Sequence, residues 1–107
     1  MGARTTWELK LNNKSVYLYS HWGGETKAFD TYKALQAAKP RWSDETYALR
    51  IFISNIVGTS WNDETGYGIS TEDEFEEEYF PMVIDFDNKE VDIDNVRIPF
   101  SDFRAVN

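Results

Sequence analysis

Residues 6–19 read TWELKLNNKSVYLY, and this stretch decides how the chain folds. Apolar and polar residues alternate on both sides of Asn12-Asn13, a pair that tolerates the positive φ angles of a two-residue type I′ turn. Such a turn fixes the register of a β-hairpin. The expected cross-strand pairs are Trp7 with Leu18 and Leu9 with Val16 on the core face, and Thr6 with Tyr19 and Glu8 with Tyr17 on the other face.

Two helices are expected after this hairpin. Apolar residues recur at helical spacing from about Lys27 to Lys39, and Pro40 ends the run because proline cannot continue a helix. Ser43 followed by two acids predicts an N-cap, and the second helix then extends to about Val57, before Gly58. Apolar residues occupy most of its circumference, so we expect this helix to be buried nearly all round.

The last third of the chain returns to strands. Gly66–Ser70 predicts a short strand, and Asn88-Lys89 is expected to join strands 82–87 and 90–94. Ile98, Phe100 and Phe103 predict a tail packed on the core. The order β-β-α-α-β-β-β indicates an α+β fold, an antiparallel sheet of four to five strands with two helices on one face. At 107 residues, we expect residues 1–107 to form a single globular domain.

Composition narrows the functional classes. The chain lacks cysteine, which excludes disulfides and a thiolate nucleophile, and no apolar run has the length of a membrane span. The net charge of −8 is uneven: residues 1–57 hold eight Lys/Arg against five Asp/Glu, and residues 58–107 hold three against fourteen. Because this charge repels phosphates, we expect no direct binding to duplex nucleic acid. The lack of a long apolar run leads us to expect no membrane partner.

Two acidic groups leave alternatives open. With a turn at Asn88-Lys89, Asp85 faces Asp92 and Asp87 faces Glu90, so either a divalent cation or basic partner offsets the repulsion, or the face is solvated. Whether Asp85, Asp87, Asp92 and Asp94 bind a cation stays open, and no cofactor is predicted. The run from Glu72 to Glu78 is either a solvated, mobile loop or a decoy whose carboxylates imitate nucleic-acid phosphates.

A candidate ligand pocket is expected where the loop after the second strand meets the loop before the third. Gly23-Gly24 precedes a helix and offers backbone N–H groups to an anion, and two tryptophans could stack a base. The predicted ligand-binding residues are His21, Trp22, Gly23, Gly24, Arg41, Arg50, Trp61, Glu64 and Thr65, with Lys27 as a further candidate cation.

Two other interpretations of this loop remain. Trp22 and Trp61 could cap the edge of the core while His21 bonds a nearby backbone group. His21 could instead act as a general base oriented by Glu25 or Glu64 in phosphodiester cleavage. A single histidine cannot form a two-histidine relay, so we predict no catalytic residues and rank an enzyme below a binding protein.

Three segments carry a family likeness. They are residues 16–24 (VYLYSHWGG), residues 41–51 with Arg41-Trp42-Ser43-Asp44, and residues 64–70 (ETGYGIS). This set resembles a group of short uncharacterised proteins encoded by tailed bacteriophages. The resemblance implies a bacteriophage protein in the cytoplasm of a bacterial host, and supplies no activity.

The leading functional hypothesis is therefore a non-enzymatic counter-defence protein, a sponge that sequesters a small anionic nucleotide-type ligand. One alternative is an acidic inhibitor of a host defence protein that imitates nucleic acid, and another is a small phosphodiesterase acting on nucleotide signals. A homo-oligomer is also expected, because the second helix has more apolar surface than one small sheet covers.

Overall fold

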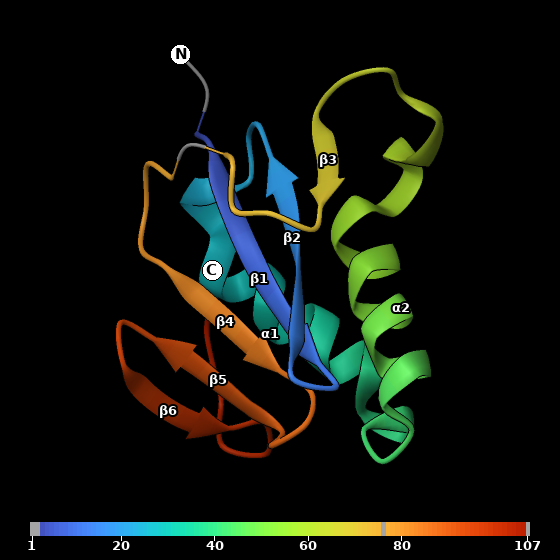
Figure 1. Cartoon of the computed structure of the whole chain (residues 1–107), viewed down its shortest axis with the longest axis vertical. Coiled ribbons are helices and arrows are strands. Elements are labelled where there is room, and N and C mark those ends of the chain that lie inside the picture. Colours follow the sequence, from blue (N-terminus) through green and yellow to red (C-terminus); the bar gives the residue numbers. More distant parts are fainter. Residues whose placement is uncertain (1–2, 76, 107) are drawn as a thin grey trace.

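A six-stranded sheet with two helices on one face forms the fold in the computed structural model, which describes residues 3–75 and 77–106 (Figure 1). The sheet order is β3-β2-β1-β4-β5-β6. The strands are β1 (Thr5–Leu11), β2 (Lys14–Ser20), β3 (Tyr67–Ser70), β4 (Met82–Asp85), β5 (Glu90–Ile93) and β6 (Val96–Pro99). The helices are α1 (Lys27–Ala38) and α2 (Glu45–Val57), with 3-10 turns η1 (Gly24–Thr26), η2 (Lys39–Arg41) and η3 (Gly58–Asn62).

The first hairpin has the predicted register. Trp7 pairs with Leu18 and Leu9 with Val16, and all but Val16 are buried in the core. Asn12 and Asn13 have φ angles of 55° and 60°, as a type I′ turn requires. The Asp87 carboxylate accepts hydrogen bonds from both turn amides, at 2.8 and 2.9 Å. These bonds, first that from Asn13 and then that from Asn12, lower the pKa of Asp87.

The sheet is larger than predicted, and it is mixed. The chain leaves β3, crosses the face opposite the helices and enters β4 alongside β1, which makes this central pair parallel, with Leu9 opposite Ile84 (Figure 1). The prediction of a four- to five-stranded antiparallel sheet was therefore wrong in strand number and in one pairing. The predicted packing of the tail on the core is confirmed, since Phe100 and Phe103 are buried and Ile98 packs against the core. The prediction missed that a turn at Asp94-Asn95, with φ of 51° and 71°, leads into an additional strand, β6.

The β4–β5 register also differs from the prediction. Ile84 pairs with Val91 and Asp85 with Glu90, so Phe86 lies in a four-residue connection and points into the core with 1% exposure. The predicted core position of Phe86 is therefore confirmed, but its predicted pairing with Val91 is wrong. Neither predicted pair of acids forms, but the shifted register places Asp85 opposite Glu90, with Lys10 4.0 Å from the Asp85 carboxylate. Asp92 faces Val83 on one side and Arg97 on the other, with an ion pair of 3.7 Å.

The helices lie close to their predicted bounds but are buried less. Asp44, not Ser43, occupies the N-cap position of α2. Only Ala48, Phe52 and Val57 of α2 are buried, because this helix packs beside α1 at the side of the sheet (Figure 1). The expectation of a helix buried nearly all round was wrong. No helix in the described ranges is long and apolar enough to cross a membrane.

Candidate functional site

The loop that precedes α1 and the loop that follows α2 meet at one end of the β2–β3 pair. Ser20 pairs with Tyr67 in an antiparallel ladder, so the loop after β2 and the loop before β3 lie at the same edge. The amide of His21 extends the ladder by donating to the Gly66 carbonyl at 2.9 Å. The expected convergence of these two loops is confirmed.

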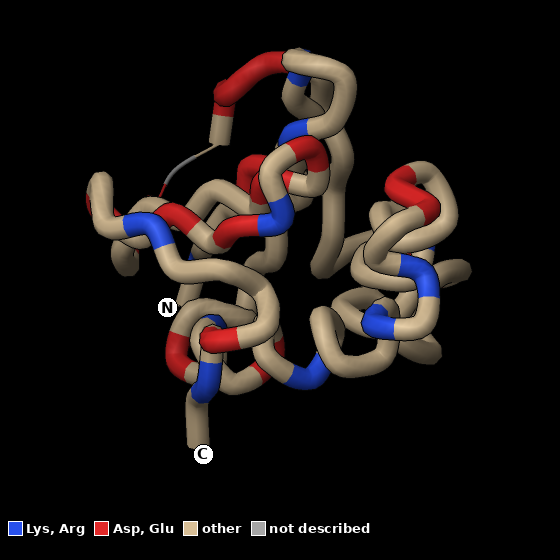
Figure 2. The backbone as a smooth tube through the Cα atoms, turned by 90° about the horizontal axis from the view of Figure 1, so that it is seen from below, with Lys and Arg blue, Asp and Glu red and all other residues tan. Residues whose placement is uncertain are grey.

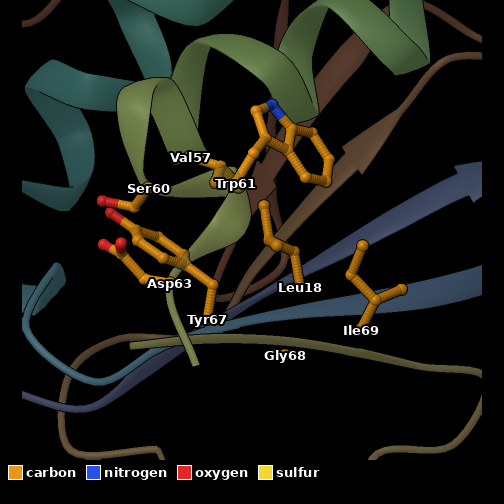
Figure 3. A pocket seen from close by; sticks show the side chains of 8 residues that line it. All are labelled: Leu18, Val57, Ser60, Trp61, Asp63, Tyr67, Gly68 and Ile69. Carbon is orange, nitrogen blue, oxygen red and sulfur yellow. The ribbon is translucent and has the colours of Figure 1, made fainter. Parts of the chain in front are cut away.

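A pocket of about 240 Å³ lies on the helix side of β3, between this strand and the end of α2 (Figure 3). Its lining residues are Leu18, Val57, Ser60, Trp61, Asp63, Tyr67, Gly68 and Ile69. Trp61 and Ile69 project at its mouth with 52% and 53% exposure. The side-chain oxygens of Ser60, Asp63 and Tyr67 lie together at one end (Figure 3). We call this feature the Trp61 pocket; it combines an apolar wall with an acidic end.

A second, open pocket of about 380 Å³ lies on the opposite face of the same strands. It is lined by Tyr19, His21, Trp22, Thr65 and Gly66. The Tyr19 hydroxyl and His21 Nδ1 are hydrogen-bonded at 2.8 Å, and the His21 and Trp22 rings stand perpendicular with centroids 4.9 Å apart. Gly66 has a φ of 104°, and a Cβ there would lie 2.8 Å from the Trp22 ring, so this position requires glycine.

The two tryptophans do not share a pocket. Successive residues of a strand point to opposite faces, and Leu18 lines the Trp61 pocket whereas Tyr19 lines the other. Trp22 therefore lies on one face of the sheet margin and Trp61 on the other. The predicted single pocket with two tryptophan walls is replaced by two pockets back to back.

The two glycines Gly23 and Gly24 are tightly packed inside the protein. Gly24 N donates to the Ala3 carbonyl at 2.8 Å, and a methyl group at Gly24 would overlap the Tyr79 ring. A Cβ at Gly23 would lie 2.6 Å from Ser20 Oγ. The Gly24 amide is thus occupied by the protein itself and is not offered to an anion.

The predicted cations lie away from both pockets. Arg41 is an exposed residue beyond the far end of α1, roughly 18 Å from the start of that helix, where it pairs with Asp44 and covers Tyr47. Arg50 is exposed on α2 and lines neither pocket, and the same holds for Glu64. Basic positions are scattered over the molecule (Figure 2).

Lys27, the remaining candidate, is buried in an internal network with 1% exposure. Its Nζ donates to the Thr6 and Phe80 carbonyls at 2.9 and 2.8 Å and pairs with the Glu77 carboxylate at 3.2 Å. Glu77 also accepts from the Thr6 amide and the Thr5 hydroxyl. Burial lowers the pKa of Lys27, and the charge of Glu77 opposes that effect.

This network holds in place part of the acidic run that was predicted to be a loop in solvent or a decoy. Glu77 occupies the position beside β1 that β4 does not reach, and Glu78 exchanges hydrogen bonds with the Arg4 backbone. Glu72, Asp73 and Glu74 are exposed, and Glu76 lies outside the described residues. The sequence carried one signal for this network: Lys27 shares the core-facing stripe of α1 with Thr31, Leu35 and Ala38.

The predicted contact between His21 and a carboxylate does not form. His21 is bonded to Tyr19 and not to Glu25 or Glu64, the two carboxylates predicted to orient it. Within residues 3–75 and 77–106, no group of three or more His, Cys, Asp or Glu could hold a metal ion. Three of the four aspartates considered for a cation accept backbone hydrogen bonds at turns: Asp85 from Asn88 at 3.0 Å, Asp87 from Asn12 and Asn13, and Asp92 from Asn95 at 2.9 Å.

Comparisons with protein families, with curated proteins and with solved structures found no match.

Proposed function

We propose that this chain is a non-enzymatic binding protein directed at another protein. Its contact surface is the end of the β2–β3 pair that carries the Trp61 pocket on one face and the pocket of Tyr19, His21 and Trp22 on the other, here called the β2–β3 margin. The observation that carries the proposal is the set of exposed apolar side chains on the two faces of this margin: Trp61 and Ile69 on the helix face and Trp22 on the other face are each more than half exposed. Exposed tryptophan beside a groove is the kind of anchor that dominates protein–protein binding energy. The resemblance to bacteriophage proteins extends the proposal to a host protein in a bacterial cytoplasm, with counter-defence as the purpose.

Charge favours a protein over the anionic nucleotide that the sequence suggested. Neither pocket is lined by Lys or Arg, and Asp63 lines the Trp61 pocket. Phosphate groups would meet a carboxylate in a molecule of net charge −8. The nucleotide sponge therefore becomes the second candidate, supported by the stacking surface of Trp22 alone.

The phosphodiesterase and the nucleic-acid mimic have weaker support. A phosphodiesterase would rely on His21 without a carboxylate partner. A mimic would need the whole run from Glu72 to Glu78, of which Glu77 and Glu78 are committed to contacts with the Arg4–Thr6 segment.

Site-specific photo-crosslinking tests the proposal. A photoreactive phenylalanine analogue replaces Trp61, Trp22 or Tyr47 in turn, and cells producing each variant are irradiated. Tyr47 is the matched control, an aromatic residue with 54% exposure on α2. We expect the same crosslinked protein from positions 61 and 22 and none from position 47. Equal crosslinking from all three positions, or none from any, would overturn the proposal.

Native mass spectrometry tests the second candidate, the nucleotide sponge. The purified protein is incubated with cyclic nucleotides and ADP-ribose derivatives, and any released ligand is weighed. A ligand bound at unchanged mass would replace the protein partner with a sponge, and a converted ligand would indicate an enzyme. We expect no bound nucleotide.

A further inference from the structure

We infer that β3 accepts an extended basic segment of the partner as an additional strand, an inference that rests on the proposed function and specifies its partner. β3 lies at one edge of the sheet and is paired on one side only, with β2. An edge strand presents backbone N–H and C=O groups in a row, and an extended peptide can pair with them.

The two edges of this sheet differ in how they are protected. β6, at the other edge, carries Arg97 and Pro99, a charge and a residue without an N–H, which are the devices that discourage strand addition. β3 has the sequence YGIS, with neither charge nor proline, and its Ile69 is 53% exposed. The β3 edge is thus the one open to another strand.

The helix face of β3 suits alternate side chains of such a strand, because the Trp61 pocket offers Leu18, Trp61 and Ile69 to every second residue of the incoming segment. The other face is covered by the chain itself, since the Phe75 ring stacks on Tyr19 at 4.8 Å and would lie 3.5 Å from a Cβ added at Gly68. Specificity would come from these apolar contacts, and affinity from the backbone pairing.

The charge beside β3 defines the chemistry of the occupant. Exposed acids precede the strand at Asp63 and Glu64 and follow it at Glu72, Asp73 and Glu74, and no Lys or Arg lines either pocket. A segment that alternates apolar residues with Lys or Arg is complementary to this surface. A second copy of this chain is not, because pairing β3 with β3 would bring two sets of these acids together.

A peptide selection tests the inference. A display library of random peptides of about twelve residues is panned on the protein, and the selected peptides are titrated into labelled protein while the backbone amide signals are followed by NMR. We expect apolar residues alternating with Lys or Arg, affinity that falls with added salt, and the largest shifts at Tyr67–Ser70.

A matched pair of variants locates the binding. Ile69→Lys places a charge on the β3 edge, and Val96→Lys does the same on β6, where Val96 is 62% exposed. Both sites are exposed, so both variants should fold. We expect Ile69→Lys to weaken peptide binding by about tenfold or more and Val96→Lys to leave it unchanged.

Equal loss in both variants, shifts centred away from β3, selection of neutral or acidic peptides, or self-association through β3 would overturn the inference. A partner crosslinked from position 61 without any β3-binding peptide would leave the proposed function standing and reject only the added strand. Absence of both the crosslink and the peptide would reject both.

Discussion

Replacing Lys27 with methionine should destabilise the fold by about 3 kcal/mol. Methionine fills the space of the buried side chain but leaves the Thr6 and Phe80 carbonyls without the ammonium donor. A buried acceptor left unpaired costs about 1–3 kcal/mol, so two of them cost about 2–6 kcal/mol, and about 3 kcal/mol lies in the lower half of that range. Glu77 adds little, because its side chain is 25% exposed and keeps its bonds from Thr5 and Thr6.

Urea unfolding followed by tryptophan fluorescence and circular dichroism measures the effect. About 3 kcal/mol corresponds to a fall in Tm of roughly 10–20 °C for a domain of this size. Lys33→Met is the matched control, since Lys33 is exposed on the same helix, and it should change stability by less than about 0.5 kcal/mol.

The pH dependence gives an independent readout. Because burial lowers the pKa of Lys27 below 10.5, the unfolded chain binds this proton more tightly than the folded chain does. The free energy of unfolding of the wild type should therefore rise as pH increases from the lowered pKa of Lys27 toward 10.5. The Lys27→Met variant should lack this rise. A Lys27→Met variant as stable as the wild type would mean that desolvating the ammonium cancels its hydrogen bonds, and would refute this reasoning.

Three further predictions concern the scaffold. Asp87→Ala should lower Tm near pH 6 by more than it does in acid. Because the pKa of Asp87 is lowered in the folded state, its carboxylate contributes stability that is present above pH 3.8 and lost as pH falls through the folded-state pKa; a Tm difference independent of pH would contradict this. Gly24→Ala should cost about 1–3 kcal/mol in urea unfolding, and Tyr79→Ala in the same chain should recover part of that loss, which an additive double variant would disprove. Phe52→Ala should cost about 3–5 kcal/mol, since Phe52 is fully buried against Phe86; a loss below about 1 kcal/mol would place it outside the core.

Local patterns predicted the parts of the fold that depend on neighbouring residues. The Asn12-Asn13 turn and the alternation around it set the register of β1 and β2, because a two-residue turn leaves one pairing that buries Trp7 and Leu9. The same reasoning gave a wrong register for the second hairpin. Phe86 continues the alternation of β4 and packs in the core against Phe52 and Phe100, but the connection to β5 is four residues long and not two.

The sequence predicted where the candidate site lies in the fold, but not which face of the sheet each of its side chains occupies. Antiparallel pairing of β2 with β3 brings the His21 and Gly66 loops together, and this follows from strand order. Which face each tryptophan occupies depends on side-chain direction in loops, where no periodicity applies. The position of Lys27 on the core-facing stripe of α1 signalled a buried ammonium group. Its partner Glu77 could not be predicted, because the contact joins a helix to a segment far along the chain and depends on β4 stopping short of Thr6.

The parallel pairing of β1 with β4 has a consequence for how the chain folds. The centre of the sheet joins residues near position 9 to residues near position 84, so most of the chain must form a closed loop before this ladder gains any hydrogen bond. High contact order of this kind predicts folding over milliseconds to seconds, slower than a helical protein of equal size. Until β4 docks, β1 is an open edge that could pair with another chain. The negative charges of Glu72–Glu74 would keep such half-formed molecules apart during that interval.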